Sequence, residues 1–321
     1  MTPTPGLLTL GETLGLVATG PLAHAGTARV GIGGAESNVA IGAARLGVPA
    51  TWVGRVGDDG WGERVARELR AEGVAAHVVV DPAASTAVMT KEQRGTRTRV
   101  TYHRTGSAGS RLAPGDLPEQ LLAGAGVLHL TGITPGLSAT ALAATREALA
   151  TARRAGVPVS FDVNHRHGVW RERDAGAVYR ELAAGAAVVL AGPEEAALLV
   201  GAGAPADEAG LLAAVRDLTD GDVVLKLGER GCLAHVDGGT HAVPAHPLAP
   251  GELVDTVGAG DAFVAGYLAE LLAGRPAAER LRTGTLCGAL ACTSPGDWEG
   301  LPTRAEVSAI AAGGDADPVR R

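Results

Sequence analysis

Short apolar runs with the composition of strands alternate along the chain with longer segments whose apolar residues recur at helical spacing. The short runs are Leu7–Leu10, Thr51–Val56, Gly126–Leu130, Pro158–Asp162, Ala187–Leu190 and Val223–Leu227. Strands separated by helices usually form parallel sheets that are covered on both faces. The pattern therefore predicts an α/β fold with a doubly wound, mostly parallel sheet flanked by helices.

Glycines mark the ends of the predicted helices. A glycine readily adopts the left-handed backbone conformation that commonly closes a helix. The helical segments and the glycines that follow them are 39–46 with Gly47, 62–72 with Gly73, 139–155 with Gly156, and 262–273 with Gly274.

Two regions, 13–32 and 86–104, interrupt the alternation of strands and helices. The second predicts two strands around a turn at Arg94-Gly95. Both regions could form a small β lid or two ordinary surface hairpins. We expect a single α/β domain over residues 1–312, with lid strands from about 13–32 and 86–104, and a frayed tail at 313–321.

Composition narrows the function classes. The 321 residues are 46% hydrophobic, enough for a large core, and the net charge of -7 gives no basic field for nucleic acid. A local basic cluster can still bind a small anion. The N-terminal Met1–Pro5 lacks signal-peptide character, and no apolar run approaches the roughly 18 residues of a membrane span. We expect a soluble, cytoplasmic protein without membrane or nucleic-acid partners.

Cysteine usage fits a reducing compartment. The three cysteines, Cys232, Cys287 and Cys292, form no Cys-x-x-Cys pair. Their odd number and their spacing imply neither a disulfide framework nor a zinc site.

The segment Gly258-Ala259-Gly260-Asp261 precedes a helical pattern. A glycine-flanked turn that opens a helix offers free N–H groups and the positive end of the helix dipole to an anion. In the first helical turn, Asp261 could accept a proton from a substrate hydroxyl while the N–H groups hold a phosphoryl group. The simpler alternative is that Asp261 caps the helix and the glycines form a tight loop.

Two other nucleotide-binding motifs are not found. A Walker A loop needs Gly-Lys before Ser or Thr, and neither Lys91 nor Lys226 follows a glycine. The dinucleotide fingerprint should follow the first strand, but residues 10–13 carry no such glycine run. A P-loop kinase is excluded, and an NAD-dependent dehydrogenase is disfavoured.

The chain resembles the ribokinase-like (PfkB) carbohydrate kinases, and within them the 2-keto-3-deoxygluconate kinases. The superfamily motifs are residues 33–40 (GGAESNVA), 53–59 (VGRVGDD) and 255–263 (DTVGAGDAF). The narrower resemblance rests on residues 33–36 (GGAE), 102–108 (YHRTGSA), 129–135 (HLTGITP) and 161–166 (FDVNHR). A ribokinase-like fold is thereby implied.

The resemblance implies that ATP phosphorylates the C6 hydroxyl of 2-keto-3-deoxygluconate to give the 6-phospho product. Asp261 would be the general base, and Gly258, Ala259 and Gly260 would form an anion hole for the γ-phosphoryl group. Two alternatives stay open: a kinase for another sugar such as fructose, ribose or a related hexonate, and a sugar-acid sensor that kept the fold without the chemistry.

The resemblance also implies binding residues. Those for the sugar acid are Gly34, Asn38, Tyr102, Arg104, Ile133, Arg166 and Asp297. Those for ATP are Asn164, Arg166, Lys226, Gly228, Gly231, Gly258 and Gly260. Glu195 would hold Mg²⁺ through water, and Asp255 with the Val257 carbonyl could contribute to a monovalent cation site.

Several of these residues also have an ordinary structural explanation. The arginines could be solvated surface charges, and Asn38 could be a helix cap. Residues 228–231 could form a plain turn, and Glu195 could be an exposed residue that starts a helix.

Some positions depart from the family pattern. Gly192 replaces Asn or Ser near the nucleotide, Met89 replaces a substrate-facing Tyr, and His103 replaces a second Tyr. Thr285 stands where a relative has Asn. The first three alter the edges of the pocket and leave Asp261 in place. By similarity we also expect a homo-oligomer that forms through the β lid.

Overall fold

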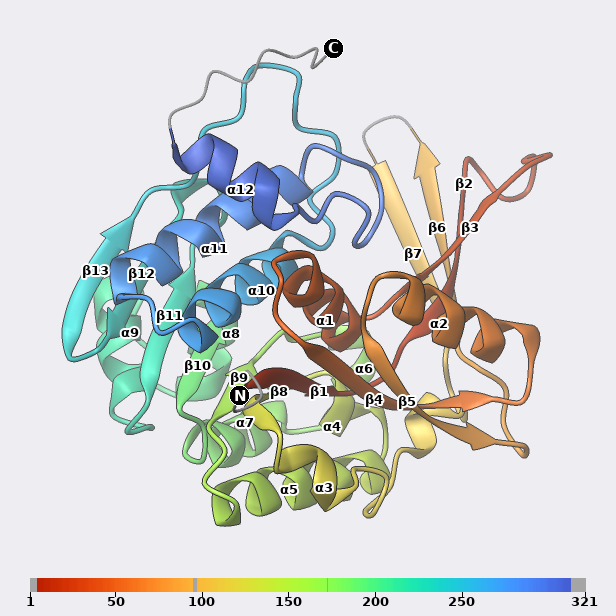
Figure 1. Cartoon of the computed structure of the whole chain (residues 1–321), viewed down its shortest axis with the longest axis horizontal. Helices are drawn as coiled ribbons and strands as arrows, with labels where there is room; N and C mark the ends of the chain where they lie inside the picture. The colour runs from red at the N-terminus through yellow and green to blue at the C-terminus, as the bar shows by residue number, and fades with distance from the viewer. Residues whose placement is uncertain (1–4, 95–96, 172, 313–321) are drawn as a thin grey trace.

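The computed structural model describes residues 5–94, 97–171 and 173–312. The strands of its main sheet are β1 (Gly6–Leu10), β4 (Ala50–Gly57), β5 (Ala75–Asp81), β8 (Ala125–Thr131), β9 (Val159–Asp162), β10 (Val188–Ala191), β11 (Asp222–Lys226), β12 (Cys232–Val236) and β13 (Gly239–Val243). They lie in the order β13-β12-β11-β10-β9-β8-β1-β4-β5 (Figure 1). The strands from β11 to β5 run parallel, whereas β12 and β13 add an antiparallel edge.

Helices cover both faces of this sheet (Figure 1). One face carries α1 (Ala35–Arg45), α2 (Gly60–Ala71), α10 (Ala259–Leu272), α11 (Ala277–Ala291) and α12 (Arg304–Ala311). The other carries α3 (Glu119–Leu122), α4 (Thr134–Leu137), α5 (Ala139–Arg154), α6 (His167–Trp170), α7 (Ala175–Ala183), α8 (Pro193–Val200) and α9 (Glu208–Arg216). Successive residues of a strand point to opposite faces of the sheet. Leu7 therefore packs with the first set of helices, and Leu8 with the second. The predicted doubly wound sheet is confirmed.

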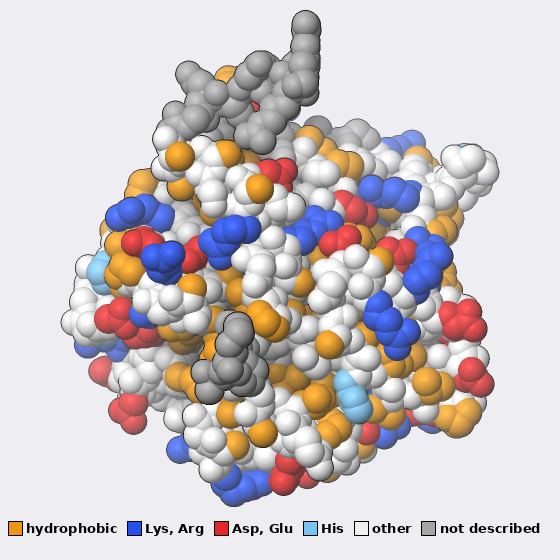
Figure 2. Space-filling view, viewed as in Figure 1, with side chains coloured by type: hydrophobic (Ala, Val, Ile, Leu, Met, Phe, Trp, Pro, Cys, Tyr) orange, Lys and Arg blue, Asp and Glu red, His pale blue; other side chains and the backbone are white. Residues whose placement is uncertain are grey.

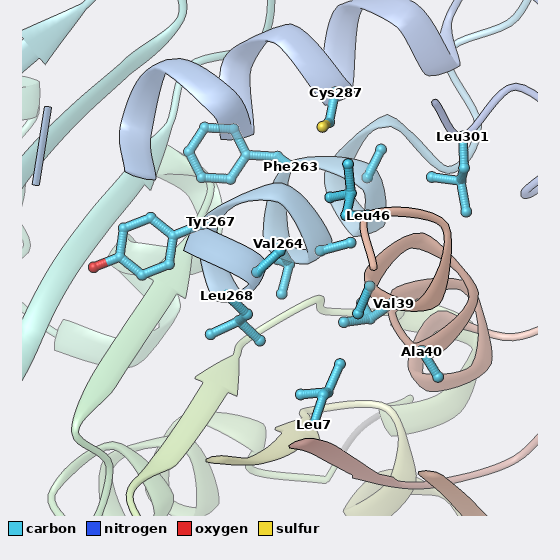
Figure 3. Packing of buried hydrophobic residues seen from close by; sticks show 14 of the residues in the cluster. Leu7, Val39, Ala40, Leu46, Phe263, Val264, Tyr267, Leu268, Cys287 and Leu301 are labelled. Atoms are coloured by element: carbon cyan, nitrogen blue, oxygen red, sulfur yellow. The ribbon is translucent and has the colours of Figure 1, made fainter. Parts of the chain in front are cut away.

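Helix α10 is the buried centre of the first face. All its residues from Asp261 to Glu270 are buried, as expected for a helix that is apolar all round. In Figure 3, Val264 and Leu268 lie on the side of α10 that faces Val39 of α1 and Leu7 of β1. This packing fixes α1 against α10.

A second sheet of four strands forms the lid. Its strands are β2 (Leu14–Thr19), β3 (Arg29–Gly33), β6 (Val88–Arg94) and β7 (Arg97–His103), in the order β3-β2-β6-β7. Because β2 pairs in parallel with β6, both regions predicted from the sequence join in one sheet and are not two separate hairpins. Figure 1 shows it projecting beside α2. Gly95 of the predicted turn and the tail at 313–321 lie outside the described residues.

Three strands of the main sheet, β5, β12 and β13, were not predicted from the sequence, and they form its two edges. Each has a histidine among its apolar residues (His77, His235 and His241), and none is buried along its whole length. On the face seen in Figure 2, Lys and Arg side chains are interspersed with Asp and Glu. In the described ranges, no helix is both long and apolar enough to cross a lipid bilayer.

The contact between α1 and α10 yields a stability prediction. A Cβ added at Gly42 of α1 would lie 2.6 Å from the Ala265 Cβ of α10. Gly42→Ala should lower the free energy of unfolding by about 1–3 kcal/mol, because neither backbone can yield without repacking the core. Urea denaturation measures this value. The matched control is Gly60→Ala in α2, where an added Cβ meets nothing within 4 Å; equal effects of the two changes would contradict the prediction.

Candidate active site

The polar residues of the site gather at the carboxyl ends of the parallel strands, where α/β sheets commonly bind ligands. Loops after β1, β8, β9 and β10, the end of β11 and the start of α10 surround two adjoining cavities of about 730 Å³ and about 80 Å³. The residues that line both cavities are Met89, Tyr102, Arg166, Val257, Gly258, Asp261 and Asp297. The boundary between the cavities therefore contains Asp261.

Asp261 lies in the first turn of α10 and is 7% exposed. The Asn38 amide donates to its Oδ2 at 2.8 Å, and the Asn164 amide donates to its Oδ1 at 3.2 Å. Burial raises the pKa of Asp261, and the Asn38 hydrogen bond and the charges of Arg166 and Lys226 oppose that rise. The carboxylate is thus fixed in position and shielded from water.

The turn before α10 presents unpaired N–H groups. Among the described residues, the N–H groups of Gly258, Gly260 and Asp261 reach no backbone or side-chain acceptor, and that of Ala259 reaches only the Thr256 carbonyl, at 3.3 Å. Gly258 has φ 79°, and any side chain there would collide with the Asp297 carbonyl. Since Gly258 and Gly260 line the larger cavity, the turn can hold an anion there.

Two cationic side chains face the larger cavity from the main sheet. Lys226 Nζ contacts both carboxylate oxygens of Asp162 at 2.7 Å. Burial lowers the pKa of Lys226. The nearby charges of Asp162 and Glu195 raise it by a larger amount, so the net shift is upward. Arg166 follows β9 and lines both cavities. Both cations lie near enough to Asp261 to favour its ionised form.

The smaller cavity is lined by every residue that was predicted to bind the sugar acid: Gly34, Asn38, Tyr102, Arg104, Ile133, Arg166 and Asp297. Asn38 is 3% exposed, and its Oδ1 has no hydrogen-bond partner in the described structure. A buried acceptor of this kind can receive a ligand hydroxyl. Gly34 has an additional reason to be glycine, because a Cβ there would collide with the Glu12 carbonyl.

Arg104 is not a free cation. Its Nε donates to Glu12 Oε2 at 2.8 Å, and its guanidinium lies 5.2 Å from the centre of the Tyr102 ring. Glu12 also accepts a hydrogen bond from the Ser107 hydroxyl at 2.8 Å. The guanidinium is therefore held rigidly at the wall of the smaller cavity.

The predicted nucleotide residues divide into two groups. Those that line the larger cavity are Asn164, Arg166, Lys226, Gly258 and Gly260. Gly228 and Gly231 are not among its lining residues. Gly231 has φ 90° and packs so closely on the Val243 carbonyl that a side chain would collide with it. This packing gives Gly231 a structural role, and nucleotide contact at Gly228 or Gly231 stays a prediction.

Glu195, predicted to hold Mg²⁺, lines the larger cavity in the first turn of α8. Its two oxygens accept the N–H groups of His165 at 2.8 Å and Gly192 at 2.7 Å. In the described ranges, no group of three or more His, Cys, Asp or Glu residues is placed to hold a metal ion. The two backbone hydrogen bonds fix the Glu195 carboxylate. It is the single protein group predicted to hold the ion.

The positions that depart from the family pattern differ in placement. Met89 lines both cavities and Gly192 lines the larger one. His103 is exposed on β7, and the Thr285 hydroxyl donates to the Arg282 carbonyl at 2.9 Å. Neither His103 nor Thr285 is among the residues that line the two cavities.

Sequence reasoning assigned no role to Glu12, Glu36 or Lys91, which belong to the site. Glu36 is fully buried at the smaller cavity, accepts hydrogen bonds from Thr131 and Thr134, and has its pKa raised to about 7 by burial. Lys91 reaches the larger cavity from the lid. Glu36 lies in the 33–40 motif that carries the resemblance, and Glu12 follows β1 at the ligand-binding edge of the sheet, so both had a usable signal and Lys91 had none.

Comparison with known proteins places this site in a family. The profile of the pfkB family carbohydrate kinases matches residues 8–304. The chain is 36% identical to the 2-dehydro-3-deoxygalactonokinase of Haloferax volcanii, with 98% of each chain covered. It is 34% identical to the 2-dehydro-3-deoxygluconokinase of Bacillus subtilis, with 94% of each covered.

Fructokinases are also similar. The chain is 37% identical to the fructokinase of Klebsiella pneumoniae over 86% of this chain and 90% of the relative. Among solved structures, a PfkB protein from Polaromonas sp. JS666 superposes with a TM-score of 0.85 at 36% identity, covering 95% of this chain and 99% of that one. The fold is shared across relatives with different names.

The buried pair of Lys226 and Asp162 yields a second prediction. Lys226→Met should lower the free energy of unfolding by about 3–5 kcal/mol, because Asp162 stays buried without its counter-charge. The double variant Lys226→Met/Asp162→Leu should recover most of that loss, since an apolar pair of similar volume needs no desolvation. Urea unfolding at neutral pH measures both variants. A single variant as stable as the wild type would show that the pair is not effectively buried.

Proposed function

The chain belongs to the pfkB family of carbohydrate kinases, and we propose that its reaction is the ATP-dependent phosphorylation of 2-keto-3-deoxygluconate at the C6 hydroxyl. The product would be 2-keto-3-deoxy-6-phosphogluconate. Sugar kinase activity follows from the family, whereas the substrate is inferred from the site and from the names of the relatives.

The position of Asp261 carries the proposal. It lies at the boundary of the two cavities, next to the N–H groups of the turn before α10. A hydroxyl in the smaller cavity and a phosphoryl group in the larger one would therefore meet at this carboxylate. Phosphoryl transfer asks the protein mainly for alignment and charge stabilisation, and this arrangement supplies both.

The reaction needs one proton transfer and one phosphoryl transfer. Asp261 takes the proton of the C6 hydroxyl, and the hydroxyl oxygen bonds to the γ-phosphorus while the bond from that phosphorus to the β-γ bridging oxygen breaks. ADP leaves with that oxygen. The unpaired N–H groups of Gly258 and Gly260 stabilise the transferring group, and Lys226 and Arg166 balance its charge; the Ala259 N–H would join them by leaving the Thr256 carbonyl.

The smaller cavity favours an acidic sugar. Arg104 and Arg166 both line it, and arginine binds carboxylates through directed, paired hydrogen bonds. Glu12 accepts from Nε and Nη2 of Arg104, which leaves Nη1 for a ligand. Two relatives named as ketodeoxy sugar-acid kinases support this class of substrate.

ATP and Mg²⁺ fit the larger cavity. We infer that Asn164, Arg166, Lys226, Gly258 and Gly260 bind the phosphates. Glu195 would hold the ion through water, since Mg²⁺ keeps several waters and needs few protein ligands. Its carboxylate is fixed by two backbone N–H groups and lines the cavity, as that role requires. When bound, the ion neutralises charge on the phosphates.

A substrate panel tests the assignment. ADP release should be fastest with 2-keto-3-deoxygluconate or its galactonate-derived epimer and slower with fructose, ribose and hexonates, because only the ketodeoxy acids match both the arginines and the family pattern. The measurement is kcat/KM for each sugar in a coupled assay. Robust turnover of fructose with none of either ketodeoxy acid would overturn the substrate and leave the kinase in place.

Asp261→Asn is the matched control in that panel. The amide keeps the size of the side chain and removes the base. Turnover should fall roughly a hundredfold or more while ligand binding, followed by calorimetry, is largely retained. Unchanged turnover would remove the base role and would favour a different acceptor for the proton.

The pH profile should depend on Asn38. Activity requires ionised Asp261, so turnover is lost as pH falls through the pKa of that group, which burial raises above its ordinary value. The Asn38 amide favours the ionised form, so Asn38→Ala raises this pKa and moves the acidic limb of kcat to higher pH. Profiles of wild type and variant, measured at saturating substrate, check the direction. A shift to lower pH would contradict it.

A further inference from the structure

Lys91 has an unusual position for a lid residue. It lies on β6, yet its side chain points inward and the residue is 8% exposed. Its Nζ lies 2.5 Å from Asp255 Oδ2 and 3.8 Å from Asp297 Oδ1. A lysine from the lid therefore balances the charge of two carboxylates, Asp255 and Asp297, that lie beside Gly258.

Both carboxylates belong to segments that shape the anion hole. Asp255 Oδ1 accepts the Val257 N–H at 3.2 Å, directly before Gly258. The Asp297 backbone packs against Gly258 so closely that no side chain fits there. The position of Lys91 is therefore linked to the position of the N–H groups that are to hold the phosphoryl group.

The charges around this point require a cation. Burial raises the pKa of Asp297 to about 6, and the charges of Asp261, Glu299 and Asp255 add to that rise, whereas the charge of Lys91 opposes it. Lys226 and Arg166 face Asp261 from the main sheet. On the lid side, Lys91 is the ammonium group that contacts Asp255 and Asp297 in the described structure. Without it, anionic phosphates would approach uncompensated carboxylates.

We propose that Lys91 is a positioning residue for phosphoryl transfer, whose ammonium group provides the positive charge beside the anion hole that a free monovalent cation would otherwise have to supply. The inference rests on the proposed phosphoryl transfer at Asp261 and is independent of which sugar is phosphorylated. A tethered cation stays bound at any salt concentration, so the enzyme needs no potassium.

The contacts of Lys91 with Asp255 and Asp297 also connect the lid to the active site. Arg29 of β3 also donates to the Pro295 carbonyl at 3.4 Å, and Trp298 donates to the Ile32 carbonyl at 3.0 Å. The lid sheet is thus joined to residues 295–298 at both β3 and β6. A second hollow of about 460 Å³, lined by Lys91, Asp255 and Gly296 among others, gives a small cation a path to Asp255 once the lysine is removed.

The test is cation dependence in Lys91→Met, which keeps the length of the side chain and removes its charge. Turnover is measured with the best sugar of the panel, with potassium or ammonium replacing tetramethylammonium at constant ionic strength. Wild type should be indifferent to the exchange. In the variant kcat should fall roughly tenfold or more, with a smaller change in KM for the sugar, because alignment of the phosphoryl group is lost. Potassium or ammonium should restore much of that kcat.

The control is Gln93→Met, an exposed change two residues along the same strand that lies in the second hollow and outside the catalytic cavities. It should behave as wild type. If Lys91→Met does not fold, Lys91→Gln replaces it, since its amide can still donate to Asp255 without a charge. Unfolding midpoints give a readout that needs no sugar: potassium should raise the midpoint of the Lys91 variant and not that of wild type.

Three results would overturn the proposal. The first is a wild-type enzyme that requires potassium. The second is a Lys91→Met variant with wild-type kcat and midpoint. The third is a loss of kcat in a folded variant that neither potassium nor ammonium restores, because a missing charge is then not the cause. Failure of every sugar in the panel would instead count against the proposed function, while the midpoints would still test Lys91.

Discussion

The structure depends on keeping one carboxylate charged while it is buried. Moving an ionised group out of water costs several kcal/mol unless hydrogen bonds and opposite charges replace the lost hydration. For Asp261 these come from the α10 N-terminus, from the amides of Asn38 and Asn164, and from two nearby cations. Asn38 reaches Asp261 because α1 packs tightly on α10 at Gly42. The close packing of α1 on α10 is therefore needed both for the hydrophobic core and for the position of the Asp261 carboxylate.

Much of the fold could be predicted from the sequence, because the buried strands carry apolar runs and the helices end at glycines. The lid sheet is also confirmed, and the residues predicted to bind the sugar acid all line the smaller cavity, although their binding role stays a prediction. The pairs Arg104–Glu12 and Lys91–Asp255 could not be predicted, since they join residues 92 and 164 positions apart and no local pattern encodes such a contact. Strands β5, β12 and β13 were missed because a histidine interrupts the apolar residues of each and none is buried along its whole length.

The charge pattern changes how selectivity should be understood. The sequence predicted that the charge of Arg104 is available to a ligand carboxylate, but in the structure Glu12 already balances that charge. The proposed sugar acid would then be recognised through the direction of the remaining guanidinium hydrogen bonds and through the cation at Arg166. Substitutions such as Met89, which lines both cavities, alter the shape of the site and leave this balance intact. In this site, shape and charge therefore rest on different residues.

The hydrogen bond between Asn38 and Asp261 spans 223 positions of the chain. During synthesis, α1 leaves the ribosome long before α10 exists, so the side of α1 that packs on α10 has no partner for most of translation. Closure of this contact is among the last folding events, and contacts of such separation form slowly. The Asp261 site therefore cannot assemble until most of the chain has been synthesised.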